Sequence, residues 1–368
     1  MGDADGSEQR IVDGRAWSDF CDALKSAGAV VLDDAAPADP LTRAEGFRYL
    51  TRLTRAAFET LVEASDPQAP ELRRTAHETI KMGLDNPDNI YQSAPIHGSC
   101  RYRITGVRGT VHYLGFGTQK GGYGSTGSLQ TTGYLEGRDL ELRGDGSFEI
   151  AVSAEPQPGN WLRMEPESRM LIVRQTRLDH AREVPAQIRI ERVDGPHRPR
   201  RFSPAQLERS LAGAAAFVHG CARLFAGWAG DFQKHANRLP RFDPEKALRA
   251  GGDPNIAYFH SYWKLAPDEA LVIEATPPKC DYWNFQLANH WLESLDYRYD
   301  RIHLNPFTAK LRADGSVRVV VAHSDPGVEN WLDTCGHAQG TMCWRWVGAA
   351  EFPEPQTRLV RRAELRGE

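Results

Sequence analysis

Apolar residues recur at helical spacing in the first part of the chain. Residues 16–28 form one amphipathic stretch that ends at a glycine, and residues 39–64 form a second. A third, short helix is predicted after Pro70. Together these stretches predict a helical N-terminal region over residues 1–85.

The strongest helical signal lies in the middle of the chain, over residues 203–236. Ser203 is a favoured N-cap residue, and Pro204 fits the first helical position, where no backbone N–H is needed. A continuous apolar seam follows, made of Leu207, Leu211, Ala214, Val218, Ala222, Phe225, Ala229 and Phe232. We therefore predict one long helix inside a linking segment that covers residues 201–250.

Short β-rich runs separated by Gly and Pro turns fill the rest of the chain. Apolar and polar residues tend to alternate in residues 148–153 and 188–193, which is typical of strands with one buried and one solvated face. The pattern predicts a first antiparallel β unit over residues 86–200 and a second over residues 251–368. The fold class is therefore α+β.

The two β regions contain the same turn and strand signals in the same order. An Asp-Gly turn, an alternating strand, a Pro-Gly turn and Asn-Trp-Leu occur over residues 145–162 and again over residues 314–332. The agreement continues to an arginine inside the next strand, Arg174 in one copy and Arg345 in the other. Common turn residues alone produce chance matches, but tryptophan is rare, so we predict an internal duplication. In each copy the asparagine is expected to bond the turn backbone, and the tryptophan to plug the edge of the core.

The second copy also carries a family resemblance. The stretch NWLDTCGHAQGTMCWRW (residues 330–346), with DGSVRVVVAHSDPG before it and DYWNFQL further upstream, resembles the bacterial domain-of-unknown-function twelve-fourteen family. Residues 85–106 resemble the segment that opens such proteins, and the likeness covers most of residues 85–360. The resemblance implies that the two related antiparallel units are β-sandwich-like. It implies no particular activity, cofactor or catalytic residue.

Composition narrows the function classes. The 45 basic and 49 acidic residues are well mixed and give a net charge of -4, so no nucleic-acid partner is predicted. No apolar run approaches the roughly 20 residues that a membrane span needs, and no secretory signal pattern is present. The six cysteines are scattered without a CxxC pair, as in a reduced intracellular protein. We expect a soluble cytoplasmic protein with a small-molecule partner, no membrane partner and an oligomeric state left open.

Ionisable residues found in only one copy of the repeat are the first candidates for chemistry. Between His323 and His337 the second copy adds several acids and a cysteine, whereas the matching part of the first copy has no histidine. A carboxylate beside a histidine fixes its tautomer and raises its basicity. We predict His337 as acid or base, Asp333 as the residue that orients it, and His323 or Tyr282 as a second proton donor. The alternative is a loop held by local hydrogen bonds.

A metal site built from the same residues is a more specific form of this hypothesis. His323, Asp333 and His337 would offer two imidazoles and a carboxylate, a set that suits zinc or iron(II). Their spacing is irregular, and neither HxH nor HExxH occurs. We therefore predict no metal and no other cofactor, and keep a His/Asp metal-dependent enzyme as an alternative.

Other polar residues are candidates for substrate binding. A strand over residues 282–287 and the loop that opens the first β unit are both rich in side chains that form hydrogen bonds. An arginine inside a strand needs a partner, which is either a structural acid or the carboxylate of a ligand. The predicted substrate-binding residues are Tyr91, Asp88, Asn284, His290 and Arg345.

One glycine-rich segment imitates a nucleotide-binding motif. GYGSTG, residues 122–127, has the GxGxxG spacing, but no helical seam follows it, as a dinucleotide site would require. We predict instead that residues 115–133 form a flexible loop over a pocket.

These observations favour an enzyme that acts on a small aromatic, terpenoid or sugar-like molecule. Its chemistry would be cofactor-independent acid/base catalysis of the hydrolase or lyase type, in a pocket between the two β units. The first alternative is a non-catalytic β-sandwich protein that binds a small molecule or carbohydrate. The second alternative is the metal-dependent enzyme.

Overall fold

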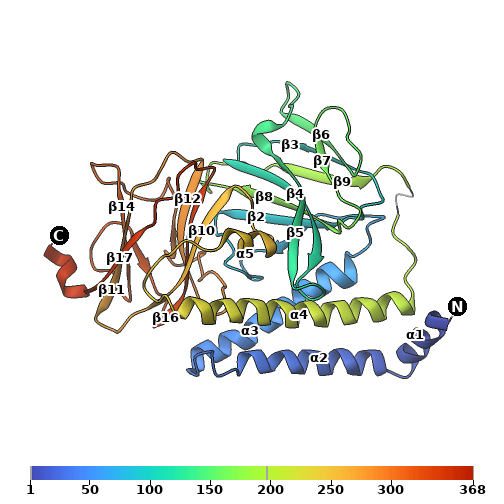
Figure 1. The fold of residues 1–368 in the computed structure, drawn as a ribbon, viewed down its shortest axis with the longest axis horizontal. Coiled ribbons are helices and arrows are strands. Elements are labelled where there is room, and N and C mark those ends of the chain that lie inside the picture. Colours follow the sequence, from blue (N-terminus) through green and yellow to red (C-terminus); the bar gives the residue numbers. More distant parts are fainter. Residues whose placement is uncertain (1, 196–197, 368) are drawn as a thin grey trace.

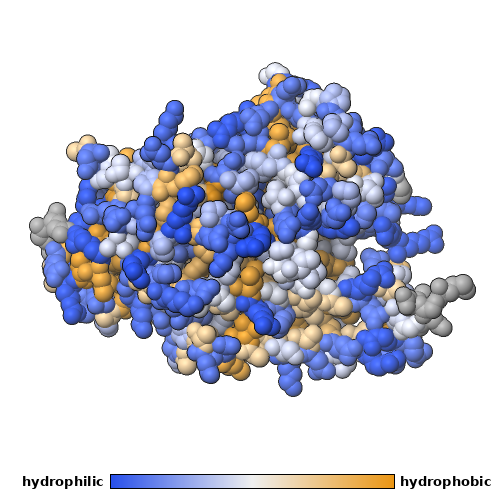
Figure 2. Space-filling model, viewed as in Figure 1, coloured by the Kyte–Doolittle hydropathy of each residue, from blue (hydrophilic) through white to orange (hydrophobic). Residues whose placement is uncertain are grey.

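The computed structural model describes residues 2–195 and 198–367. Figure 1 shows two β-rich units side by side, with a layer of helices along one side of both. Polar residues cover most of the face seen in Figure 2, and apolar residues appear in scattered patches between them. Among the described residues, no helix combines the length and apolar character that crossing a membrane would require.

The N-terminal region is helical as far as residue 63. It contains α1 (Gly2–Val12), α2 (Arg15–Val31) and α3 (Pro40–Ala57), and α3 continues as the π-helical turn η1 (Phe58–Glu63). The Asp39 carboxylate caps α3 by accepting a hydrogen bond from the Thr42 backbone N–H at 2.9 Å.

The prediction of a third helix after Pro70 is wrong. Residues 73–76 form strand β1 (Arg73–Ala76), which pairs with β2 (Asn89–Pro95) at the edge of the first sheet. Pairing with a neighbouring strand outweighs the weak local preference of a short segment for helix.

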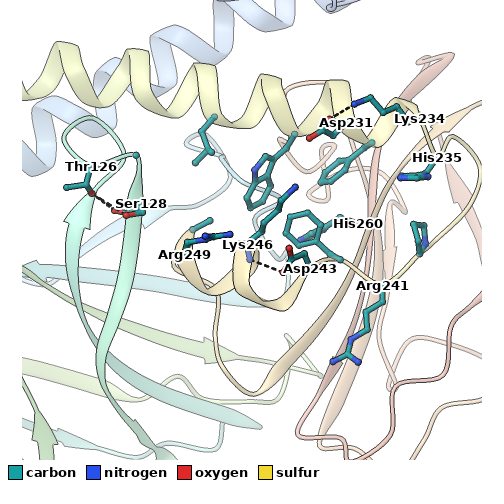
Figure 3. Close-up of a pocket in the computed structure, with 17 residues that line it drawn as sticks. Thr126, Ser128, Asp231, Lys234, His235, Arg241, Asp243, Lys246, Arg249 and His260 are labelled. Atoms are coloured by element: carbon teal, nitrogen blue, oxygen red, sulfur yellow. Dashed lines mark hydrogen bonds and ion pairs between the residues drawn. The ribbon is translucent and has the colours of Figure 1, made fainter.

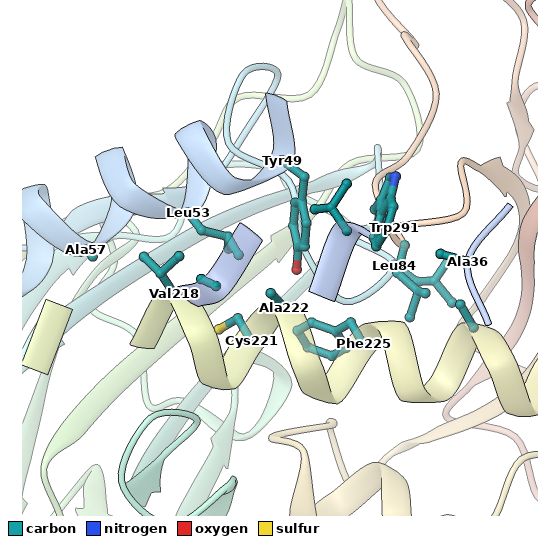
Figure 4. Close-up of a cluster of buried hydrophobic side chains, with 14 of the residues drawn as sticks. Ala36, Tyr49, Leu53, Ala57, Leu84, Val218, Cys221, Ala222, Phe225 and Trp291 are labelled. Atoms are coloured by element: carbon teal, nitrogen blue, oxygen red, sulfur yellow. The ribbon is translucent and has the colours of Figure 1, made fainter. Parts of the chain in front are cut away.

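The long helix is confirmed as α4 (Pro204–Gln233), with the Ser203 hydroxyl accepting from the Gln206 backbone N–H. Its predicted seam is buried against α2, α3 and the second β unit, and Figure 4 shows Val218, Ala222 and Phe225 of this seam. Tyr49 and Leu53 of α3 and Trp291 of the second unit complete the cluster. The short helix α5 (Pro244–Arg249) follows α4 and leads into the second β unit.

The first β unit consists of two sheets. One sheet has the order β1-β2-β8-β4-β5, which adds β8 (Met170–Thr176), β4 (Tyr113–Gly122) and β5 (Ser128–Glu136) to the two strands already given. The other has the order β7-β6-β3-β9, made of β7 (Trp161–Arg163), β6 (Ser147–Ser153), β3 (Tyr102–Val107) and β9 (Gln187–Arg192). The turn η2 (Gly137–Asp139) follows β5. The apolar faces of the two sheets share one buried core.

The second β unit also consists of two sheets. One has the order β10-β16-β12-β13, made of β10 (Ile256–Lys264), β16 (Gln339–Val347), β12 (Tyr282–Ala288) and β13 (His303–Leu304). The other has the order β15-β14-β11-β17, made of β15 (Trp331–Asp333), β14 (Val317–Ala322), β11 (Glu269–Ala275) and β17 (Gln356–Arg361), with η3 (Arg362–Gly367) after it. Its core is rich in aromatic rings, and Trp283 stacks on Trp344 with ring centroids 5.2 Å apart.

The strand orders confirm the duplication. The order β7-β6-β3-β9 corresponds strand for strand to β15-β14-β11-β17, and β2-β8-β4-β5 corresponds to β10-β16-β12-β13. In each copy the strand that begins at the repeated tryptophan pairs in parallel with the strand before it, while the other strand pairs within the described residues are antiparallel. The fold is therefore α+β with two related sandwich-like units, as predicted.

The shared turn residues make the same contacts in both copies. Asn160 Nδ2 donates to the backbone oxygens of Glu141 and Glu149, and Asn330 Nδ2 donates to those of Lys310 and Arg318. The indole N–H of Trp161 donates to Ser153 O at 3.2 Å, and that of Trp331 donates to Ala322 O at 3.0 Å. The repeated letters are thus explained by one repeated turn structure.

Candidate functional site

A cavity of about 390 Å³ is lined by both β units and by α4. Its volume is within the range of pockets that hold small organic molecules. Apolar and aromatic side chains form much of its wall, among them Met82, Tyr123, Ile172, Phe217, Phe225 and Trp228. The exposed side chains of Glu71, Arg73 and Arg169 lie at its rim.

Matching residues of the two copies meet at this cavity. In the first sheet Tyr91 of β2 lies opposite Arg174 of β8, and in the second unit Tyr258 of β10 lies opposite Arg345 of β16. All four residues line the cavity. The duplication therefore supplies two tyrosine–arginine pairs to a single space.

Each arginine reaches across to the other copy. Arg174 Nη2 donates to Gly251 O at 2.6 Å, and Arg345 Nη2 donates to Leu84 O. These two acceptors lie at the same place in the duplicated unit, seven residues before Tyr258 and Tyr91 respectively. Both also have a positive φ, 82° for Gly251 and 60° for Leu84.

The loops that contain these acceptors share further contacts. The Asn86 backbone N–H donates to the Tyr91 hydroxyl at 3.1 Å, and the Asp253 backbone N–H donates to the Tyr258 hydroxyl at 3.2 Å. Asn86 and Asp253 are therefore equivalent positions, each followed by a proline. The exchange of contacts between the copies is reciprocal.

The charge at this equivalent position is different in the two copies. Asp253 is fully buried, and its Oδ2 lies 3.8 Å from Arg174 Nη1, so Arg174 has a counter-ion. Asp253 also accepts hydrogen bonds from the hydroxyls of Tyr113 and Tyr134, at 3.1 and 3.2 Å. The corresponding Asn86 carries no charge.

Arg345 is held by neutral groups instead. Its Nη1 donates to Asn284 Oδ1 at 3.1 Å and to Gln286 Oε1 at 2.6 Å, and the third bond goes to the Leu84 carbonyl. Only 3% of Arg345 is exposed. Within residues 2–195 and 198–367, no carboxylate lies within 4.0 Å of its guanidinium nitrogens.

Two buried polar atoms belong to residues of the cavity wall and have no hydrogen-bond partner among the described residues. They are His260 Nδ1 and Gln119 Oε1, and the two residues are 6% and 2% exposed. His260 stacks on Tyr258 and Phe232, with ring centroids 5.2 and 5.6 Å away. Burial and the nearby charge of Arg345 hold the pKa of His260 well below its usual range, so its imidazole is neutral at pH 7.

The comparisons with known proteins agree with the suspected family. The family model described as "Protein of unknown function (DUF1214)" matches residues 266–351. The second β unit therefore contains a DUF1214 domain. The crystal structure of a putative uncharacterized protein from Burkholderia cenocepacia is similar to this DUF1214 protein, with 53% identity, a TM-score of 0.95 and coverage of 97% of this chain and 99% of that chain.

A more distant structure has a similar fold. The VPA0106 protein from Vibrio parahaemolyticus is 13% identical, with a TM-score of 0.51 and coverage of 86% of this chain and 98% of that chain. At this level of identity the likeness concerns the fold alone. No curated protein matches the chain.

Five of the predicted site residues of this DUF1214 protein lie together at or behind the cavity wall. Tyr91 and Arg345 line the cavity. Behind them the Tyr282 hydroxyl donates to Asp88 Oδ2 at 2.6 Å, and Asn284 Nδ2 donates to Asn86 Oδ1 at 2.9 Å. Tyr282, Asp88 and Asn284 thus support the wall instead of facing the space.

Asp88 is the centre of a small buried polar cluster. Its Oδ1 lies 2.9 Å from His180 Nε2 and 3.1 Å from His303 Nε2, while its Oδ2 accepts from Tyr282. Burial alone would raise the pKa of this carboxyl, but the two histidines and the tyrosine hydroxyl outweigh it and lower the pKa. The cluster ties the first β unit to the second.

His290 is a core residue. Its Nδ1 lies 3.0 Å from the Tyr262 hydroxyl, and its ring packs against Trp291. Burial lowers the pKa of His290 to about 4, and the residue is not part of the cavity lining.

His337 and Asp333 do not form the predicted pair. His337 Nε2 lies 3.0 Å from Glu45 Oε2 of α3, and its Nδ1 lies 2.9 Å from Thr334 O. The Asp333 carboxylate instead accepts from the Cys335 backbone N–H at 2.8 Å and closes a local turn. A distant acid on a helix has taken the place of the neighbouring one, which sequence spacing could not reveal.

The residues proposed for a metal site are also separated by their contacts. His323 Nδ1 lies 2.9 Å from Thr334 Oγ1 and does not converge with Asp333 and His337 on one point. In the part of the chain that the structure describes, no group of three His, Cys, Asp or Glu side chains is placed to hold a metal ion. None of these three residues lines the cavity.

The segment predicted as a flexible loop is a hairpin. Strands β4 and β5 pair from Gly115–Glu136 to Gly122–Ser128, because the cross-strand hydrogen bonds outweigh the turn preference of the glycines. The hairpin tip packs closely on α4, and a Cβ at Gly124 would lie 2.3 Å from the Ala216 carbonyl carbon. The prediction that this segment borders a pocket is confirmed, since Gln119, Tyr123 and Leu129 line the cavity.

Sequence reasoning missed Tyr258, His260 and the equivalence of Asn86 with Asp253. The available signal was the repeat itself. Extending the alignment upstream from Arg174 and Arg345 places NPDNIY (residues 86–91) against DPNIAY (residues 253–258). That alignment would have identified Tyr91 and Tyr258, and the acids in the two loops, as candidate site residues.

A second hollow lies on the surface between α4 and α5 (Figure 3). It has a volume of about 740 Å³ and is lined by five basic side chains, Lys234, His235, Arg241, Lys246 and Arg249. Asp231 pairs with Lys234 at 2.7 Å, and Asp243 caps α5. Trp228, His260 and Ala250 line both this basic groove and the inner cavity, so they form the wall between the two.

Proposed function

We propose that this DUF1214 protein binds a small, largely apolar organic molecule in the cavity between its β units. The observation that carries the proposal is the pair of orphaned polar atoms, His260 Nδ1 and Gln119 Oε1, in a wall that is otherwise mainly apolar. Burying a polar atom without a partner costs about 1 to 3 kcal/mol, and a ligand with matching polar groups would recover that cost.

The character of the wall supports an aromatic, terpenoid or aliphatic body for the ligand. Phe217, Phe225 and Trp228 of α4 supply flat apolar surfaces, and Met82 and Ile172 supply adaptable or branched ones. A sugar would need many free hydrogen-bonding groups, whereas polar side chains of this wall such as Asp85, Asn86 and Arg174 are already bonded to other groups of the protein. Of the two predicted classes, binding of an apolar molecule is therefore favoured over binding of a carbohydrate.

Acid/base catalysis of the hydrolase or lyase type in the same cavity is the second candidate. It is favoured by the neutral imidazole of His260, which has one ring nitrogen without a partner among the described residues. The hydroxyls of Tyr91 and Tyr258 remain protonated at pH 7, because burial raises the pKa of both groups. One proton acceptor and two proton donors among the residues of one cavity support this candidate, because such chemistry needs both kinds of group.

The binding proposal can be tested by filling the cavity. Ile172 in β8 lines the space, whereas Ile188 in β9 is a similarly half-buried isoleucine that does not line it. We expect Ile172→Trp to abolish the binding of decan-1-ol and decanoate in isothermal titration calorimetry, and Ile188→Trp to leave binding intact. If neither probe binds the wild-type protein, or if both variants bind alike, the cavity is not the ligand site.

A further inference from the structure

We infer that the ligand of this cavity carries a carboxylate and that Arg345 binds it. The inference rests on the proposed function, because it names the class of molecule that the same cavity would take. The inference comes from a difference between Arg174 and Arg345. The duplication placed these two equivalent arginines around one cavity, but their surroundings differ in charge.

The first copy demonstrates what completes such an arginine. Arg174 reaches across to Gly251 and has the buried carboxylate of Asp253 beside it. Arg345 of the second copy makes the same crossing hydrogen bond, to the matching loop of the first copy, but that loop has Asn86 where the carboxylate would be. A ligand carboxylate at Arg345 would restore the missing half of the ion pair.

The donor count of Arg345 leaves room for that ligand. A guanidinium has five N–H donors, and three of those of Arg345 donate to Asn284, Gln286 and Leu84. The remaining two donors, one on Nη2 and one on Nε, have no partner among the described residues. A carboxylate accepts two such bonds from an arginine, which is the geometry that this side chain favours.

The acids near Arg345 do not fill this role. Asp85 lines the cavity, but its two oxygens accept from the backbone N–H and the hydroxyl of Ser294, at 3.0 and 2.8 Å. The buried Lys81 also contacts Ser294, because its amine donates to Ser294 O and Leu295 O. Its positive charge offsets the charge of Asp85. Glu71 is exposed at the rim and pairs with Arg73.

The second copy also has two neutral side chains that bind its arginine in the absence of an acid. Asn284 and Gln286, which orient Arg345, replace Gly115 and Gly117 at the matching positions of β4. The first copy uses the space at Gly115 for the Tyr134 hydroxyl, which helps to hold Asp253. Two neutral amides thus fix the Arg345 guanidinium while leaving its charge for a ligand. The ligand class is an apolar carboxylic acid.

The decisive experiment places the missing acid in the protein. We expect wild-type protein to bind decanoate about 10- to 100-fold more tightly than decan-1-ol in calorimetry at pH 7.5, as a charge-assisted pair of hydrogen bonds would give. Asn86→Asp should remove most of that preference and leave decan-1-ol affinity unchanged. Asp253→Asn, the reciprocal change in the loop of the second copy, should not weaken decanoate binding.

A second variant covers the case in which Asn86→Asp does not fold, as judged by circular dichroism and thermal unfolding. Arg345→Gln should bind decanoate and decan-1-ol equally well. Equal binding of both probes by the wild-type protein would overturn the carboxylate inference while the cavity proposal stands. Binding of neither probe would overturn the cavity proposal itself, so the two failures are distinguishable.

Discussion

The loops over residues 84–88 and 251–255 are copies of one structure with different charges. Each contributes a backbone oxygen to the arginine of the other copy and a backbone N–H to a tyrosine hydroxyl. One loop carries Asp253 and the other carries Asn86 at the same point. The duplication has preserved the contacts that set the backbone and varied the group that sets the charge, which is where a binding site can evolve without loss of the fold.

The same contrast appears within each unit. The Asn-Trp turns, which do not line the cavity, make matching contacts in both copies. At the cavity, the strand positions opposite the arginines differ, with Gly115 in one copy and Asn284 in the other. Similarity between the copies therefore indicates structure, and difference near the shared space indicates function.

The strongest test of this contrast removes the polar side chain at the equivalent position in each copy. Asp253→Ala leaves the buried Arg174 without a counter-ion and should destabilise the fold by about 3 to 5 kcal/mol. Asn86→Ala removes only neutral hydrogen bonds and should cost about 1 to 3 kcal/mol. Urea unfolding of both variants measures the difference, and equal losses would contradict the unequal charge environments.

The turns provide the matched comparison where the copies are alike. Asn160→Ala and Asn330→Ala each remove a side chain that bridges three backbone groups. We expect losses of about 1 kcal/mol for Asn160 and about 2 kcal/mol for Asn330, because Asn330 is more fully buried. Chemical denaturation provides the measurement, and a negligible effect in one copy would mean that the two turns are not equivalent in energy.

Much of this architecture could be predicted from local patterns. The seam of α4, its Ser203 cap and the repeated Asp-Gly and Asn-Trp signals are encoded by neighbouring residues, so the sequence specifies them directly. The short strand β1 was missed because its pairing with β2 is a tertiary interaction. The hairpin of β4 and β5 was missed for the same reason, since its glycines favour turns in isolation.

The candidate site was only partly predictable. Arg345 was found because an arginine inside a strand is unusual, and Asn284 because it lies on the polar face of a predicted strand. Tyr91 and Asp88 were found because polar residues are dense in the loop before the first strand. His337 was predicted because it lies close in sequence to several acids, yet its partner Glu45 comes from α3, far away in the sequence. His260 had no acidic neighbour to mark it, and its environment of aromatic rings arises only when α4 packs on β10.

The contact between His337 and Glu45 gives a pH-dependent test of whether this histidine is structural. Burial opposes protonation, but the hydrogen bond and charge of Glu45 outweigh it and raise the pKa of His337. Since the folded-state pKa is raised, the stabilisation is complete below the ordinary histidine pKa of about 6.5 and is lost as pH rises through the raised value.

We expect His337→Gln to remove this pH-dependent component, on the order of 1 kcal/mol, from urea unfolding measured between pH 5 and 9. Decan-1-ol binding by the variant should match that of the wild-type protein. A large loss of binding with unchanged stability would mean that His337 has a functional role and not only a structural one.

The smallest expected effect concerns how the ligand arrives. Lys246 and Arg249 lie at the basic groove, which shares Trp228 and His260 with the cavity wall. Their charges should attract an anion before it reaches Arg345, and such steering changes the association rate more than the dissociation rate. For the double variant Lys246→Glu and Arg249→Glu, we expect stopped-flow association of decanoate to slow about 2- to 5-fold at low salt, with decan-1-ol unaffected.

Because the steering is long-range, added salt should abolish the difference in association rate between the variant and the wild-type protein. The preference of Arg345 for decanoate should persist, since that arginine is buried. A salt-independent change in both probes would instead mean that the groove supports the cavity wall structurally and does not steer anions.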